Sequence, residues 1–554
     1  MIRKAQAYNI LITIIFLILV PAIFHITFSC FGFNPTDEGA VLAGARRIVE
    51  GQIPHRDFIS IRPTFSFFLH IPFVIWGGSY TFWLSRLFAW FQCACIGWAW
   101  MLITGKAAGL FYNKVEKFLY AIIALMCSVN IVPIMAWHTL DGLFFLSVGF
   151  IFCLKRAHRE KFFGYAIIGL SYLCKQSFLP AVFISILILG DFRRISLWIA
   201  ASIPAIVYTI YLWLGKAIPD ALVQLTFYNK ILYFSYVIRP YFANISLLYG
   251  IIAGFFSTYL IFNHKVSHNP PLRIDVKRLI GLLVLYALFM FGAMELVRNR
   301  YNIFSFCLFG AVIGLAIYFI IAKKGIKESD ILKICFLGLL ASWCTSLSLG
   351  YNYPSLASGP LGLVILAAIS LSCEQDDKKY TMRRVSAILN CVILAVFALS
   401  FFVARLKYPY RDKPAWELNS GLGGVLKGAN LIRTNSVTYE FFEDLKSAID
   451  KANGKIYAII PDLAAYWVKS EQVNPLRVDW VSPVEIGNKA AMDNFTKGLK
   501  YRRGDIIFIV GKFDIRSLAY GLEPISDTER YEVVYYIRTN FAKIGETKFF
   551  ELYK

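Results

Sequence analysis

Charged residues are scarce in this sequence. Aspartate, glutamate, lysine and arginine make up 17% of its 554 residues, whereas a soluble domain carries about a quarter. Hydrophobic residues make up 58% of the chain, and its mean hydropathy is +0.58. A composition of this kind excludes an ordinary soluble protein and predicts a chain that crosses a membrane many times.

Several motifs of well-known chemistry are also missing. No cysteine follows Cys391, and most of the eleven cysteines lie within apolar runs, so the sequence predicts neither a disulfide framework nor a cysteine metal centre. There is no clear glycine-rich phosphate loop, no HExxH motif and no plausible Ser-His-Asp arrangement. These absences argue against a nucleotide-binding enzyme, a zinc protease and a serine hydrolase.

Apolar runs close to the ~20-residue length of a spanning helix recur along most of the chain. They predict about 11–13 transmembrane helices. The first run follows Arg3 and Lys4, but it is long for a signal peptide and lacks a small-residue cleavage site, so we interpret it as a membrane helix. The predicted spans are 9–31, 81–103, 115–134, 139–154, 162–174, 176–189, 195–214, 242–262, 279–295, 302–322, 331–347, 355–373 and 385–404.

The net charge of +22 is distributed as in a membrane protein. Lysine and arginine concentrate in every second short loop, and the positive-inside rule places these loops and the N-terminus in the cytoplasm. We therefore expect a plasma-membrane protein (inner membrane in a bacterium) and no nucleic-acid partner. The loop residues are Lys155, Arg156, Arg159, Lys161, Arg193, Arg194, Lys265, Arg273, Lys277, Arg278, Lys323, Lys324, Lys327, Lys378, Lys379, Arg383 and Arg384.

The chain divides into two predicted domains. Residues 1–405 form a transmembrane domain, and residues 406–554 form a small α/β domain on the outer face. Within the second domain a helix capped by serine or threonine is expected at 436–451. Short strands are expected at 455–460, 505–511, 531–537 and 548–553.

The outer segment 32–80 is long enough to hold structure of its own. Within it, residues 37–50 place four apolar side chains on one face at helical spacing, which predicts a helix in the membrane interface. Thr36 is a candidate cap for this helix, and Asp37 and Glu38 would complement its dipole. The apolar face consists of Val41, Ala45, Ile48 and Val49.

Charged residues at the edges of the predicted spans gather on the outer side. Such residues are costly in a membrane and mark function unless they are paired. Structural explanations stay open: Glu295 and Arg298 are spaced as an ion pair, and Arg86 is able to snorkel. Lys175 is the hardest to explain structurally, because a lysine at a break between two apolar helices needs either an anion or a carboxylate. The outer set is Asp37, Glu38, Arg62, Arg86, His138, Asp141, Lys175, Glu295, Arg298 and Arg300.

Short motifs recur along nearly the whole chain. They are Asp37-Glu38-Gly39, Glu50-Gly51, His55-Arg56-Asp57-Phe58, Arg62-Pro63, Thr139-Leu140-Asp141, Lys175-Gln176, residues 346–360, Tyr410-Arg411-Asp412 and Asn474-Pro475. These motifs resemble those of the polytopic C-fold glycosyltransferases that use polyprenyl-phosphate sugars, a group that includes protein mannosyltransferases and the aminoarabinose transferase. Residues 34–63 carry the strongest part, although His55 and Thr64 depart from the common tyrosine and proline.

The resemblance implies a GT-C-like transmembrane catalytic domain, in which Asp37 is the principal carboxylate. Glu38 would support it or help to hold a divalent metal ion, the candidate cofactor. No nucleotide cofactor is implied. The donor phosphate would be bound by Arg62, Lys175, Arg298 and Arg300, and further substrate contacts would come from Arg56, Asp57, His138 and Asp141.

The expected reaction is transfer of the sugar, with inversion, from a polyprenyl-phosphate donor to a lipid, glycan or protein acceptor, among membrane lipids. The sequence specifies neither the sugar nor the acceptor. Two other classes stay open, a lipid-linked sugar flippase or other transporter and a non-catalytic envelope scaffold.

Overall fold

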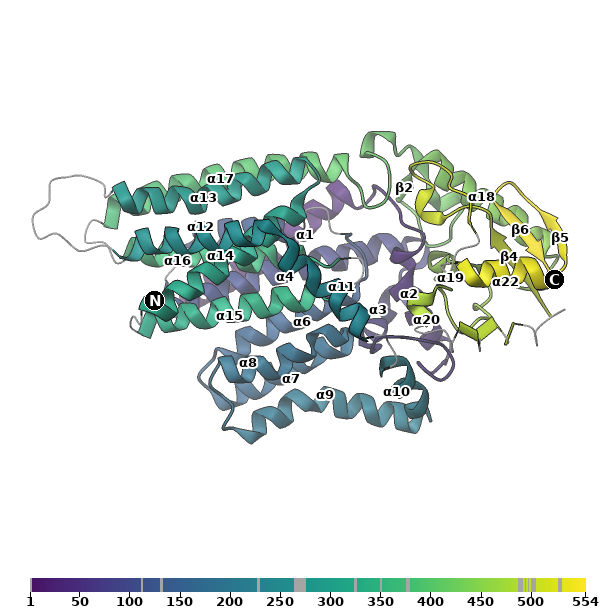
Figure 1. Ribbon diagram of the computed structural model, residues 1–554, viewed down its shortest axis with the longest axis horizontal. Coiled ribbons are helices and arrows are strands. Elements are labelled where there is room, and N and C mark those ends of the chain that lie inside the picture. The colour runs from purple at the N-terminus through teal and green to yellow at the C-terminus, as the bar shows by residue number, and fades with distance from the viewer. Residues whose placement is uncertain are drawn as a thin grey trace, which may run out of the picture.

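A long helix bundle carries a small strand-containing domain at one end (Figure 1). The N-terminus lies at the far end of the bundle from the C-terminal strands. The computed structural model describes residues 2–110, 113–129, 133–226, 230–263, 276–322, 326–348, 351–374, 379–486, 492–493, 495–496, 498–499, 505–526 and 531–554.

Each of the thirteen predicted apolar runs corresponds to one bundle helix. Among the described residues, nine helices are long and apolar enough to cross a membrane, so the chain is a polytopic helical protein. The nine are α1 (Ile2–Phe28), α4 (Thr81–Ala107), α9 (Ile195–Leu214), α12 (Ile245–Phe262), α13 (Val276–Val297), α14 (Tyr301–Ala322), α15 (Ile326–Ser346), α16 (Ser358–Glu374) and α17 (Lys379–Lys407). The shorter four are α5 (Lys114–Ser128), α6 (His138–Cys153), α7 (His158–Cys174) and α8 (Leu179–Ile188).

Small residues bring α12 and α14 into direct backbone contact. Gly250 and Gly254 on α12 face the backbone of α14, and Gly310 and Gly314 on α14 face the backbone of α12. A Cβ atom at any of the four would overlap a carbonyl oxygen of the facing helix. Close approach of this kind is a main source of helix association where lipid removes the hydrophobic driving force.

The predicted interfacial helix exists as α2 (Asp37–Val49), but its surroundings differ from the expectation. Val41 and Ala45 are buried in a core that includes residues of the C-terminal domain, so this face packs against protein. The predicted threonine cap is wrong, because Thr36 makes no capping bond. Instead the Asn34 side chain accepts hydrogen bonds from the backbone N–H groups of Thr36 and Asp37.

Three further helices were not among the predicted elements. They are α3 (Phe65–Trp76), α10 (Ile218–Thr226) and α11 (Lys230–Ala243). Short 3-10 turns also occur at η1 (Gly78–Tyr80), η2 (Gln176–Phe178), η3 (Ser355–Ala357), η4 (Ala415–Glu417), η5 (Leu422–Gly424) and η6 (Ile515–Ser517).

A four-stranded sheet forms the centre of residues 406–554, which we call the C-terminal domain. Its order is β3-β4-β6-β5, with β3 and β4 parallel and the other two pairs antiparallel. The sheet strands are β3 (Ile456–Ile460), β4 (Ile506–Gly511), β5 (Lys543–Glu546) and β6 (Phe550–Tyr553), with a separate pair β1 (Ser420–Gly421) and β2 (Arg433–Thr434). The helices are α18 (Ser436–Lys451), α19 (Ala464–Trp467), α20 (Pro483–Ile486) and α22 (Glu532–Asn540).

Two sequence predictions for this domain were wrong in detail. The strand expected at 531–537 is helix α22, because Val533, Val534 and Ile537 share its buried face at helical spacing. Helix α18 starts as predicted, but its cap is Asn435, whose side chain accepts from the Thr438 N–H at 2.9 Å.

The C-terminal domain docks directly on α2. The Arg47 guanidinium forms two hydrogen bonds of 2.7 Å with the Asp479 carboxylate. Gly39 of α2 lies against the backbone of Ala464 and Ala465 in α19. Because a core cluster of the C-terminal domain continues into α2 and α3, the domain does not pack as an isolated unit.

We predict that Gly39→Ala weakens this docking. The new Cβ would overlap the Ala465 backbone, and overpacking of this kind costs about 1–3 kcal/mol. Thermal unfolding and limited proteolysis of the purified protein should show a lower melting temperature and faster cleavage than in wild type. Gly421→Ala is the matched control, because nothing lies within 4 Å of its added Cβ. Equal behaviour of the two variants would contradict this packing.

Candidate functional site

A cavity of about 560 Å³ lies where the end of the bundle, α2 and the C-terminal domain meet. Its size falls within the range of small-molecule and headgroup sites, about 300–1,000 Å³. Four residues selected from the sequence come together in it, although the chain carries them far apart. The charged and polar lining includes Asp37, Arg62, His138, Thr139, Lys175, Gln176, Ser177, Arg411, Asp479 and Glu485.

Asp37 is held at the first turn of α2. The Tyr410 hydroxyl donates to its Oδ2 at 2.8 Å, and Arg411 pairs with the same oxygen at 2.9 Å. Both partners lie in the segment that directly follows α17, so this segment orients the Asp37 carboxylate. These two contacts orient the Asp37 carboxylate and limit its rotation.

Lys175 lies at the break between α7 and η2. Its extended backbone, with φ −158° and ψ 134°, ends α7 and starts the next turn. The side chain is only 7% exposed, and its ammonium group donates to the Thr139 hydroxyl at 3.0 Å. No carboxylate pairs with it in the part of the chain that the structure describes.

Two uncharged polar atoms accompany this ammonium group. His138 Nδ1 and Ser177 Oγ are buried in the lining and have no hydrogen-bond partner among the described residues. A buried polar group without a partner costs free energy, on the order of 1–3 kcal/mol. The cluster of Lys175, His138 and Ser177 therefore has the capacity to bind a polar, negatively charged group.

Arg62 faces a carboxylate contributed by the C-terminal domain. Its two terminal nitrogens donate to the two oxygens of Glu485 at 3.0 and 2.9 Å. Glu485 belongs to the short helix α20, and no pattern in the sequence indicates that it pairs with Arg62. Arg62, Lys175 and His138 all line this cavity.

Aromatic and aliphatic side chains complete the walls. The Tyr351 ring lies 5.1 Å from the Trp137 ring and 6.3 Å from the Tyr410 ring, measured between centroids. Such a lining suits an amphiphile with a polar head and a long apolar chain. The remaining apolar wall includes Phe58, Ile61, Phe67, Pro180, Leu225, Val237, Trp343 and Leu347.

Two of the predicted acidic residues have structural partners outside the cavity lining. Glu38 is buried and receives two hydrogen bonds from Arg86, whose guanidinium also donates to the carbonyls of Ser29 and Gly32. This network joins α2 to α4. Asp141 is fully buried as well, and its Oδ1 accepts from Gln92 at 2.7 Å and lies 3.2 Å from His70 Nε2.

Four other predicted residues also lie outside the lining. Arg56 and Asp57 pair with each other on the surface at 2.8 Å. Arg298 lies at the end of α13, where it pairs with Glu295 at 3.2 Å, and Arg300 follows in the turn before α14. The structure therefore separates this pair of arginines from the cations around Lys175.

The described residues contain no group of three or more histidine, cysteine, aspartate or glutamate side chains that could hold a metal ion. Glu38, the expected metal partner of Asp37, is instead engaged by Arg86. The divalent metal ion that the sequence resemblance allowed stays a prediction.

Searches of family models, curated proteins and solved structures found no match to this chain. The structure itself defines a polytopic helical protein with a cavity at one end of its bundle, and both polar and apolar side chains line that cavity.

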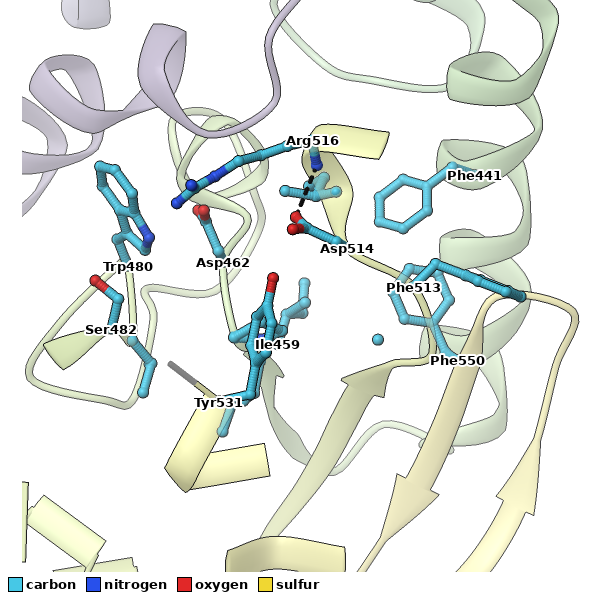
Figure 2. A pocket seen from close by; sticks show the side chains of 15 residues that line it. Phe441, Ile459, Asp462, Trp480, Ser482, Phe513, Asp514, Arg516, Tyr531 and Phe550 are labelled. Atoms are coloured by element: carbon cyan, nitrogen blue, oxygen red, sulfur yellow. Dashed lines mark hydrogen bonds between the residues drawn. The ribbon is translucent and has the colours of Figure 1, made fainter. Parts of the chain in front are cut away.

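A second acidic residue links the C-terminal domain to the start of α2. The Thr36 hydroxyl donates to Asp462 Oδ2 at 2.7 Å, directly beside Asp37. Burial raises the pKa of Asp462 to about 8, and the nearby Asp37 charge adds to the rise although the Thr36 bond opposes it. Figure 2 shows Asp462 in a small hollow with Trp480, Ser482, Asp514 and Arg516.

We predict that Asp462→Asn stabilises the protein only at high pH. A carboxyl with a pKa near 8 when folded and about 4 when unfolded makes the folded state lose stability as pH rises through that window. Asparagine keeps the Thr36 bond and never ionises. Melting temperatures measured from pH 5 to pH 9 should therefore diverge in favour of the variant. At pH 9 its free energy of unfolding should exceed that of wild type by at most a few kcal/mol. Curves that stay parallel would contradict the buried carboxyl, and Asp450→Asn on the exposed face of α18 is the control.

Proposed function

We propose that this protein is an integral membrane glycosyltransferase that moves a sugar from a polyprenyl-phosphate donor to an acceptor at the outer membrane face. The observation that carries the proposal is the buried Lys175 ammonium group, which shares a cavity with the Asp37 carboxylate and has no carboxylate partner among the described residues. The resemblance of residues 34–63 to this enzyme class supports it independently.

The cation favours a phosphate ligand on energetic grounds. An ammonium group has three donors, and the structure gives one of them a partner, the Thr139 hydroxyl. Burial of an uncompensated charge is costly, so an anion that enters this space gains strong charge-assisted hydrogen bonds. A phosphate on a long lipid fits, because the wall beyond Lys175 includes Pro180, Trp343 and Leu347.

The carboxylate gives the site its chemistry. In the proposed reaction the acceptor's nucleophilic oxygen or nitrogen attacks the anomeric carbon, and the bond from that carbon to the phosphate oxygen breaks. Asp37 takes the proton from the acceptor as general base, and Lys175 stabilises the negative charge of the departing polyprenyl phosphate. One displacement inverts the anomeric configuration. Arg411 and Tyr410 keep Asp37 oriented, and no step needs a metal ion.

A transporter accounts less well for the arrangement. Transporters commonly bind their substrates near the middle of the membrane between repeated helix bundles. Asp37, Arg62 and Lys175 instead line a cavity that the C-terminal domain also lines at one end of the bundle. This one-sided placement favours chemistry at a membrane face over passage through it.

We predict that Lys175→Gln weakens the binding of polyprenyl phosphate, the lipid part of the donor, about 10- to 100-fold. A hydrogen bond to a charged group contributes about 1.5–3 kcal/mol. Native mass spectrometry of the purified protein with polyprenyl phosphate measures this directly. The exposed Lys427→Gln, in a surface pair with Glu471, should bind as wild type does. Equal retention of the lipid by both variants would remove the role assigned to Lys175.

We predict that Asp37→Asn lowers turnover about 10²- to 10⁴-fold, the usual contribution of a general base, and leaves polyprenyl-phosphate binding intact. Mass spectrometry of envelope glycolipids and glycans from a deletion strain complemented with each variant reports the product. Asp450→Asn, exposed on α18, should restore the product fully. A folded Asp37→Asn protein with normal turnover would show that the carboxylate is not the base.

A further inference from the structure

A second hollow lies at the carboxyl ends of the parallel strands β3 and β4. Asp462 follows β3, and Asp514 and Arg516 follow β4. The carboxyl edge of parallel strands is where α/β domains usually bind ligands. We call this space, lined also by Trp480 and Ser482, the strand-end hollow (Figure 2).

Two buried polar atoms in this hollow lack partners. Asp462 Oδ1 and Ser482 Oγ have no hydrogen-bond partner among the described residues, and the two side chains belong to residues only 7% and 8% exposed. Native proteins rarely leave such atoms unsatisfied. The hollow therefore has unused hydrogen-bonding capacity in a fixed geometry.

An aromatic ring and a guanidinium group stand beside these atoms. The Arg516 guanidinium lies 5.8 Å from the centre of the Trp480 ring, and in Figure 2 it extends toward both Asp462 and Trp480. A carboxyl, a hydroxyl and a guanidinium provide both donors and acceptors. Together with an indole ring, they suit the hydroxyl groups and the apolar ring face of a sugar.

The strand-end hollow adjoins the large cavity. Trp480 lines both spaces, and Asp462 bonds to Thr36, the residue before Asp37. A molecule held at Trp480 can thus present a hydroxyl group toward the Asp37 carboxylate. The proposed donor contact lies elsewhere, because Lys175 lines the large cavity and not the strand-end hollow.

We propose that the strand-end hollow is the acceptor subsite and that the acceptor is a saccharide. This assignment rests on the proposed transferase function and adds the acceptor's chemical class to it. The space inside the hollow is about 30 Å³, enough for one or two water-sized groups. One or two sugar hydroxyls enter it and bind Asp462 and Ser482, while the ring lies at the mouth against Trp480.

The test measures saccharide binding without any donor. Full-length protein in nanodiscs is applied to a glycan array, and the strongest glycan is then titrated by saturation-transfer NMR. Trp480→Ala and Ser482→Ala should each weaken binding about tenfold or more, and Trp480→Phe should restore part of it. Trp416→Ala is the control, because Trp416 lies in the same domain, is 63% exposed and does not line the hollow.

The outcomes separate this inference from the proposed function. Lys175→Gln should bind the saccharide as wild type does, but it should bind polyprenyl phosphate about 10- to 100-fold more weakly. If wild-type protein retains no glycan, or Trp480→Ala and Ser482→Ala both bind as Trp416→Ala does, the acceptor subsite is wrong, and the donor experiment still decides the transferase. If saccharide binding depends on Trp480 but polyprenyl phosphate does not bind, the hollow is a saccharide-binding site but not an acceptor subsite, and the transferase function falls.

Discussion

The ion pair between Arg47 and Asp479 is the constraint on which the site depends. It joins α2 to a segment 432 residues further along the chain through two parallel hydrogen bonds, and Arg47 also donates to the Leu476 carbonyl. The Arg47 side chain is only 3% exposed, so solvent screens this pair far less than a surface pair. Asp479 is followed by Trp480 and, six residues later, by Glu485, and all three line the large cavity. The ion pair therefore helps to fix the position of this part of the cavity wall.

The charged side chains of the large cavity differ in whether a charge of opposite sign pairs with them. Asp37 meets Arg411, and Arg62 meets Glu485, so each of these charges has an internal counterpart. Lys175 has a hydroxyl instead. This difference makes Lys175 the point where a ligand's negative charge gains most.

The sequence predicted the helices well because their signal is local. A run of apolar residues reveals a span wherever it packs, and Lys175 stood out because it interrupts such a run. The sequence alone could not predict that Arg62 pairs with Glu485 or that Glu38 pairs with Arg86, because each pair joins segments that only the fold brings together. The strand predicted at 531–537 was wrong for a different reason. The β-branched and aromatic residues of this segment favour a strand, but Val533, Val534 and Ile537 are buried together on one face of a helix.

The central claim is that Lys175 binds the phosphate of a lipid-linked donor. Cryo-electron microscopy of the protein in nanodiscs with polyprenyl phosphate tests it most directly. The account predicts phosphate density within about 3 Å of the Lys175 ammonium nitrogen, with the lipid chain along the wall that contains Pro180 and Trp343. Phosphate density at Arg298 and Arg300, with Lys175 still bonded only to Thr139, would contradict it.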